Sequence, residues 1–151
     1  MMNYVFISPV YPITCTLFCD RLNRMGANVL GIGDTPYHDL SELLKNALRE
    51  YYYVSSLEDY DQVYRAVAYY IHKYGRIDWL ESMNEYWLRT DAKLRTDFNI
   101  AVGTREDQIG TIVRKSEMKK GLWKRVSRQP ASISFPTWIP PEILSLKSDI
   151  L

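Results

Sequence analysis

The stretch that decides the fold is residues 50–82, "EYYYVSSLEDYDQVYRAVAYYIHKYGRIDWLES". Its first part, "EYYYV" (50–54), has the aromatic and β-branched composition of a strand. An apolar stripe at helical spacing follows and ends at Gly75, as a helix closed by glycine does. "IDWLES" (77–82) is a second short apolar run that ends in polar residues. A strand, a helix and a strand in this order predict parallel neighbours, because parallel strands need a crossover connection.

The alternation of expected strands and helices continues on both sides of this stretch. Ser55 and Glu58 have the spacing of a capping box and predict the start of the central helix. "NIAVG" (99–103) is expected to be a short strand or an extended link. Further strands are expected at Asn3–Ile7 and Asn28–Gly33, and further helices at Ile13–Met25, within residues 34–48, and at Tyr86–Phe98, Arg105–Ile112 and Ser116–Lys124.

Strands that alternate with helices of this length predict an α/β fold. We expect a three-layer Rossmann-like domain with a mostly parallel sheet of four to five strands and helices on both faces. The domain is expected to cover residues 1–124. Residues 125–151 contain Pro130, Pro136, Pro140 and Pro141, and we expect them to form an irregular tail.

Ligands of such folds bind outside the carboxyl ends of the strands. The segment "ESMNEYW" follows the fourth expected strand and clusters Glu81, Asn84 and Glu85. Two carboxylates there suit general acid and base chemistry or a bound cation. They equally suit a helix N-terminus, where acidic side chains are stabilised by the macrodipole.

Two other motifs argue against common cofactors. Gly31 and Gly33 in "LGIGD" lack the third glycine of a dinucleotide fingerprint and do not follow the first strand, so NAD is not expected. Cys15 and Cys19 share an expected helix with apolar neighbours, which favours reduced core thiols over a disulfide or half of a metal site. His38 and His72 lie far apart, so no metal site is expected.

Charge is unevenly distributed along the chain. Residues 1–113 carry 11 Lys and Arg against 15 Asp and Glu, whereas residues 114–128 carry seven basic residues and Glu117 alone. A solvated helix face is one interpretation of this basic segment, and contact with a phosphate-bearing ligand is the other. Lys115 lies at an expected helix start, where an ammonium group and backbone N–H groups can hold a phosphate together.

The tyrosines do not indicate nucleic-acid binding. Eight of the twelve lie between Tyr51 and Tyr74, among acidic rather than basic neighbours. Base stacking needs basic residues beside the rings, so core and interface packing is expected instead. No stretch approaches the roughly 20 apolar residues of a membrane span, and no signal peptide is visible at the N-terminus. A cytoplasmic protein with no membrane contact is therefore expected.

Four segments carry a resemblance to a known family. They are "YVFISPVYP", "NVLGIGD", "SLEDYDQVYRAVAYYIHKYGRIDWLESMNEYWLRTDAKLRTDFNI" and "IVRKSEMKK". In this order they resemble the N-terminal portion of bacterial ATP-grasp proteins, a superfamily of carboxylate–amine and carboxylate–thiol ligases. The resemblance spans roughly Asn3 to Lys120. It implies a Rossmann-like pre-ATP-grasp domain that packs against nucleotide-binding domains and helps to shape the substrate site.

The resemblance also implies roles for single residues. Lys115 matches the lysine that contacts the nucleotide phosphates, and Glu85, with Asn84 beside it, matches a place of substrate or interdomain contact. ATP and Mg are implied for the full-length family. Residues 125–151 do not resemble the continuation of that family, and paired acidic metal ligands are missing. We therefore expect a truncated ligase relative that has no catalytic residues and no cofactor of its own.

Two other classes of function remain open from the sequence. The domain can be a stand-alone module that binds a small anionic or nucleotide ligand at its strand ends. Alternatively, it can be an interaction subunit that forms a homodimer or docks to a separate ATP-grasp chain.

Overall fold

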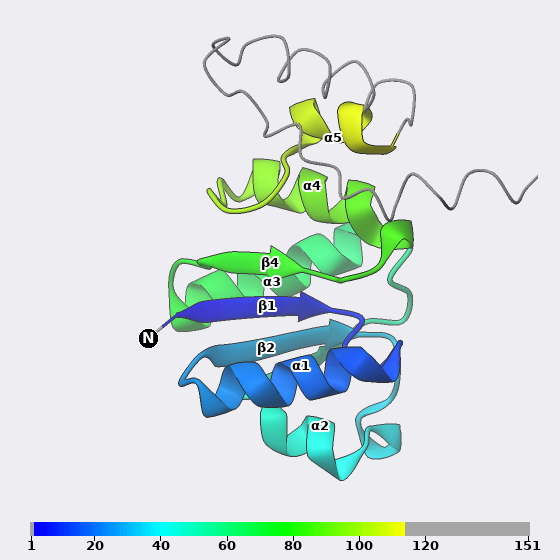
Figure 1. Ribbon diagram of the computed structural model, residues 1–151, viewed down its shortest axis with the longest axis vertical. Helices are drawn as coiled ribbons and strands as arrows, with labels where there is room; N and C mark the ends of the chain where they lie inside the picture. The colour runs from blue at the N-terminus through cyan, green and yellow to red at the C-terminus, as the bar shows by residue number, and fades with distance from the viewer. Residues whose placement is uncertain (1, 114–151) are drawn as a thin grey trace, which may run out of the picture.

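Residues 2–113 are described by the computed structural model, and Figure 1 shows them as one parallel sheet flanked by helices. The strand order is β3-β2-β1-β4, and all three strand pairs are parallel. The strands are β1 (Asn3–Ile7), β2 (Asn28–Gly33), β3 (Glu50–Tyr53) and β4 (Trp79–Glu81). In the register, Asn3 of β1 lies opposite Asn28, and Tyr4 lies opposite Trp79. The α/β fold with a parallel sheet is thus confirmed.

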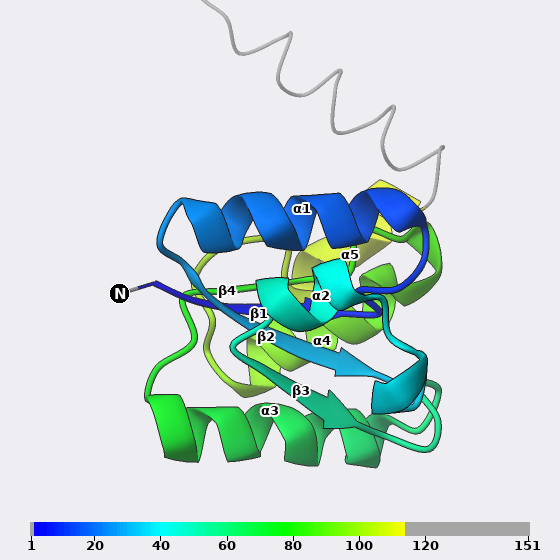
Figure 2. The ribbon, with the colours of Figure 1, turned by 90° about the horizontal axis from the view of Figure 1, so that it is seen from below.

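Helices cover both faces of the sheet, which gives the three expected layers. In Figure 2, α1 and α2 lie on one face and α3 lies on the other. Figure 1 shows α4 beside β4, on the side away from β1, with α5 further out. The helices are α1 (Ile13–Arg24), α2 (Glu42–Ala47), α3 (Tyr60–Tyr74), α4 (Leu88–Asp97) and α5 (Glu106–Val113), with short 3-10 turns η1 (Tyr37–Asp39) and η2 (Glu85–Trp87).

Each face of the sheet has its own apolar core. Every residue of β1 and β2 is buried, as expected of central strands that are covered on both sides. One core lies under α3 and centres on Val5, Leu30, Val67 and Tyr70. The other lies under α1 and α2 and includes Phe6 and the expected core thiols of Cys15 and Cys19.

Element boundaries differ from the sequence expectations in a few places. The third strand ends at Tyr53 rather than at residue 54, and the fourth covers Trp79–Glu81 rather than residues 77–82. Residues 99–103 form a link without strand pairing. The helix expected over Tyr86–Phe98 begins as the 3-10 turn η2 and continues as α4. The helix expected at Ser116–Lys124 and the tail at 125–151 lie outside the described residues.

The expected capping box of α3 is wrong. Asp59 is the cap instead, because its short carboxylate accepts hydrogen bonds from the backbone N–H groups of Asp61 and Gln62. Ser55 does not reach the helix backbone. Its N–H and hydroxyl both donate to the Gln62 side-chain oxygen, at 2.8 and 2.9 Å. The helix therefore begins at Tyr60.

Candidate functional site

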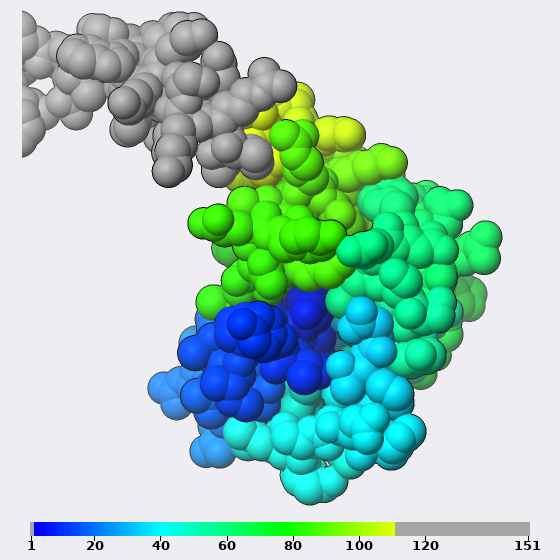
Figure 3. Space-filling model, turned by 90° about the vertical axis from the view of Figure 1, so that its right-hand side faces the viewer, coloured from blue at the N-terminus to red at the C-terminus, as the bar shows by residue number. Residues whose placement is uncertain are grey.

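The loops after β1 and β4 diverge at the carboxyl edge of the sheet. From β1 the chain steps to β2 and β3 on one side, and only later does β4 join the other side of β1. In open parallel sheets, ligands bind where the strand order reverses in this way. Figure 3 looks onto this edge, where the blue start of α1 adjoins the green residues after β4. We take these two loops as the candidate functional site.

The loop after β1 leaves the strand through a strained residue. Ser8 has a φ of 57° and donates its backbone N–H to the Ile32 carbonyl at 2.8 Å. The Thr16 hydroxyl of α1 donates to the Pro9 carbonyl at 3.1 Å, which fixes the loop to the helix. A non-glycine residue with positive φ costs on the order of 1 kcal/mol, and such residues concentrate at functional sites.

The loop after β4 has the same feature. Met83 has a φ of 54° and is half exposed. Next to it, Asn84 caps η2, because its side-chain oxygen accepts from the Tyr86 N–H at 3.0 Å. The Tyr86 hydroxyl donates to Glu58 at 2.7 Å. The loop after β4 is therefore linked to the loop that precedes α3.

Two of the three residues expected to bind ligands lie in this loop. Asn84 is half-buried, and its side-chain NH₂ has no hydrogen-bond acceptor within residues 2–113. Glu85 is exposed, and its carboxylate has no partner in the same part of the chain. Glu85 also stands in the first turn of η2, so the helix-terminus interpretation applies to it too. Lys115 lies outside the described residues, and all three roles stay predictions.

Beneath this loop lies a buried pair of charged side chains that the sequence reasoning missed. Asp91 and Arg95 of α4 are 0% and 2% exposed. The Asp91 Oδ2 atom accepts from the Ser82 N–H at 3.1 Å and from the Ser82 hydroxyl at 2.6 Å. The Arg95 guanidinium donates to the Leu80 carbonyl through Nε at 2.9 Å and Nη2 at 2.8 Å. Both residues thus bond backbone groups on the open side of the edge strand β4.

Arg95 also ties neighbouring segments to this edge. Its guanidinium donates to Glu81 Oε2 at 2.8 Å and to the Thr104 carbonyl at 3.0 Å. Gly103 passes so close that a Cβ there would lie 2.6 Å from Arg95 Nε, and its φ is +96°. Glycine is therefore required at this position for both reasons.

The environment of Asp91 raises the pKa of its carboxyl group strongly. Burial raises the pKa of Asp91 to about 7, against the lowering effect of the Ser82 hydrogen bonds and the Arg95 charge. Glu81 adds a smaller raising contribution. The Asp91 Oδ1 atom is buried without a hydrogen-bond partner, the only such side-chain atom in the described part of the chain. A carboxyl group that titrates near neutral pH therefore supports the loop that carries Asn84 and Glu85.

The helical spacing contained a signal for this pair. The apolar side of the expected helix was recognised from Trp87, Leu94 and Phe98. Asp91 lies four residues after Trp87 and three before Leu94, and Arg95 lies three before Phe98. Both charged residues therefore belong to the buried face.

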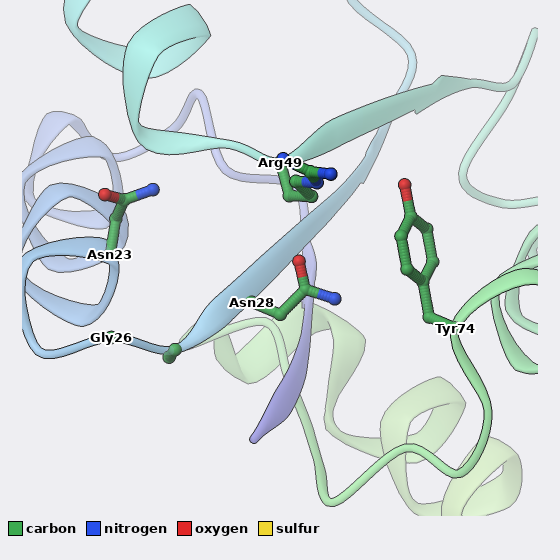
Figure 4. A pocket seen from close by; sticks show the side chains of 6 residues that line it. Asn23, Gly26, Asn28, Arg49 and Tyr74 are labelled. Carbon is green, nitrogen blue, oxygen red and sulfur yellow. The ribbon is translucent and has the colours of Figure 1, made fainter. Parts of the chain in front are cut away.

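A hollow at the opposite, amino edge of the sheet is a second place for a ligand (Figure 4). It has a volume of about 430 Å³ and is lined by Asn23, Gly26, Ala27, Asn28, Arg49 and Tyr74. Helices α1 and α3 end at this edge, so their negative dipole ends face it and Arg49 suits them. The charge of Arg49 is therefore explained by the helix ends and does not require a ligand. The positive-φ residues lie in the loops at the carboxyl edge, so we favour that edge as the ligand site.

Neither thiols nor metal ligands form a site in residues 2–113. Burial raises the pKa of Cys19 to about 12, with a smaller contribution from Cys15, so this thiol stays protonated in the core. No group of three or more His, Cys, Asp and Glu side chains in this range could hold a metal ion. Nor does the same range contain a helix that is long and apolar enough to cross a bilayer.

Comparisons with known proteins identify the fold only. No family model matches the chain, and no curated protein matches it. One solved structure that matches is the crystal structure of L-amino acid ligase from Bacillus licheniformis, with a TM-score of 0.59 and 16% sequence identity. The match covers 82% of this chain and 30% of the ligase chain. The protein therefore shares the fold of part of that ligase.

Proposed function

We propose that this chain is the substrate-side domain of an ATP-grasp-type ligase that joins a carboxylate to an amine or a thiol. It would act together with a nucleotide-binding unit and would have no activity alone. The observation that carries the proposal is the carboxyl edge of the sheet. There, two loops with strained residues diverge, and the Asn84 NH₂ group and the Glu85 carboxylate have no partner within the described residues. The resemblance of the sequence to ATP-grasp proteins and the fold shared with an L-amino acid ligase support it.

In this proposal the domain binds and orients the substrate. The nucleotide-binding unit would hold ATP and Mg. The substrate carboxylate would take the terminal phosphoryl group of ATP with release of ADP, and an amine or thiol would then displace inorganic phosphate from the acyl phosphate. The Asn84 NH₂ group can donate a hydrogen bond to a substrate carboxylate, and the Glu85 carboxylate can accept from a substrate ammonium group. Lys115 is proposed to contact the nucleotide phosphates.

An apolar rim around the same edge supports docking of this unit. Tyr11, Ile13, Met83 and Tyr86 are 72%, 66%, 49% and 66% exposed. Large apolar side chains that gather beside polar loops are typical of an interaction surface. The unit can belong to a separate chain, in which case this protein is the interaction subunit of a two-chain ligase. A homodimer through the same rim is the competing arrangement.

The coding DNA offers the first test. The nucleotide sequence beyond the Lys124 codon is translated in its three forward frames, and the neighbouring genes are inspected. The proposal predicts a glycine-rich phosphate loop and paired acidic metal ligands in one of these places. If none of them encodes such a unit, the proposal is wrong, and a stand-alone binding module becomes the better account.

Activity then tests the role of the edge. The chain is assayed with its nucleotide-binding unit for phosphate release from ATP in the presence of mixed L-amino acids. Glu85→Gln is expected to raise KM for the amino substrate several-fold, because the neutral amide loses the attraction to an ammonium group. Glu42→Gln on α2 is the matched control, since Glu42 pairs with Lys45 away from this edge. Equal KM values for both variants would contradict the assignment.

A further inference from the structure

We propose that Asp91 and Ser82 form a proton-dependent latch that sets the shape of the loop after β4. This inference concerns the loop itself and goes beyond the proposed function. It rests on the hydrogen bonds of two side chains that are both fully buried, Asp91 on α4 and Ser82 at the end of β4.

The Ser82 hydroxyl has two possible acceptors but only one proton. It lies 2.6 Å from Asp91 Oδ2 and 3.4 Å from the Asn84 carbonyl oxygen. The Asn84 N–H points back at the same hydroxyl oxygen, also at 3.4 Å. The short distance shows that the bond to Asp91 dominates, and the two long distances show a loop that is only loosely closed. Met83, with its φ of 54°, lies between the two ends of this contact.

Protonation of Asp91 would reverse the dominant bond. A proton on Oδ1 would have no acceptor, because that atom is buried and unpartnered. The proton taken from solvent therefore belongs on Oδ2, from where it is donated to the Ser82 hydroxyl oxygen. Ser82 then turns its own proton to the Asn84 carbonyl. The Ser82 N–H still bonds the second lone pair of Oδ2, so the net change is one proton gained and a tighter Ser82–Asn84 contact.

Burial, more than the surrounding charges, places this change near neutral pH. Within the described residues, the charged or titratable groups that face Asp91 are Arg95 on its own helix, Glu81 on β4 and Tyr4 on β1. Burial is the largest influence and raises the pKa of Asp91, Glu81 raises it further, and Arg95 lowers it. The loop that carries Asn84 and Glu85 therefore changes its hydrogen bonds in the range where cellular pH varies.

The latch is tested by following backbone amide resonances of the isotope-labelled full chain across about pH 5 to 9. The amides of Ser82, Met83 and Asn84 are expected to shift together, with one common midpoint that matches the Asp91 carboxyl carbon. In Asp91→Asn this shared transition should vanish, because the amide cannot gain the proton. A wild-type loop without a shared transition, or a transition that persists in Asp91→Asn, would overturn the proposal.

Two further variants separate the latch from a mere structural contact. Ser82→Ala should leave Asp91 titrating at a higher midpoint, since one hydrogen bond to the carboxylate is gone, while the Asn84 amide no longer responds. If Asn84 still follows Asp91 in that variant, Ser82 is not the relay. Glu85→Gln is the matched control on the same loop, and its transition should coincide with that of the wild type.

Discussion

Within residues 2–113, a charged cluster at the carboxyl end of β4 and another at the amino end of β3 are built differently. At the carboxyl end of β4, Asp91 and Arg95 are buried and bond mainly to backbone groups. At the amino end of β3, Glu50 accepts from the side chains of Lys73, Tyr69 and Tyr74, and Lys73 remains 45% exposed. A buried charge is costly unless hydrogen bonds compensate it. Here the compensating groups are Ser82 and the Leu80 carbonyl, so the buried charges also fix the end of β4 and the loop after it. The Glu50 carboxylate, in contrast, accepts its hydrogen bonds from side chains.

The pKa values of the carboxyl groups in the two clusters are shifted in opposite directions. Burial raises the pKa of Asp91 to about 7. For Glu50, burial acts in the same direction, but the hydrogen bonds from Lys73, Tyr74 and Tyr69 outweigh it and lower the pKa. The comparison therefore predicts opposite effects of pH on stability, in addition to different sensitivities to mutation.

The largest effect is expected from Arg95→Met. The substitution keeps the apolar bulk but leaves the Leu80 carbonyl and the Glu81 carboxylate without their donor. Removal of one partner from a buried ionic network costs about 3–5 kcal/mol of unfolding free energy. Urea unfolding of the full chain measures it, with Arg24→Met as control, because Arg24 is exposed in an ion pair with Asp20. A loss similar to that of the control would show that the β4 edge does not depend on Arg95.

The second effect is a loss of stability with rising pH. Asp91 has a folded pKa of about 7 against a reference of 3.8, so the folded state holds a proton that the unfolded state has released. Its contribution is fully present below the reference pKa and declines by about 1.4 kcal/mol per pH unit as pH rises towards 7. Unfolding measured across this range should show the decline in the wild type. Asp91→Asn should flatten it, and an unchanged slope in the variant would assign the decline to another group.

The smallest change in unfolding free energy is expected from Lys73→Met, in the cluster around Glu50. Because Lys73 is exposed, solvent replaces its bond to Glu50, and the unfolding midpoint at neutral pH should stay close to that of the wild type. The small remaining difference should disappear at acid pH, where Glu50 is protonated in both proteins. The lowered pKa of Glu50 adds stability above the reference value of 4.5 that is lost as pH falls, and this loss should become smaller in the variant. A large destabilisation at neutral pH would remove the distinction between the two clusters.

The sequence predicted the central part of the fold well. The bounds of β1 and β2 agree with the expectations, because buried apolar runs that end at proline or glycine leave little freedom. The edge strand β4 ends one residue earlier than expected because the chain turns there into a loop held by Asp91, and that contact comes from a separate helix. The sequence also yielded no prediction that Asp91 supports the candidate site, because charged residues in a helix are usually exposed. Asn84 and Glu85 could be located from the strand end that precedes them.

The most direct measurement of the central claim compares the two edges of the sheet as ligand sites. The isotope-labelled full chain, with its nucleotide-binding unit, is titrated with mixed L-amino acids and ATP–Mg while the backbone amide resonances are followed. We predict shifts at Ser8, Val10 and Tyr11 and at residues 82–86, at the carboxyl edge. Shifts confined to Asn28, Arg49 and Tyr74 would place the ligand in the amino-edge hollow and contradict the account.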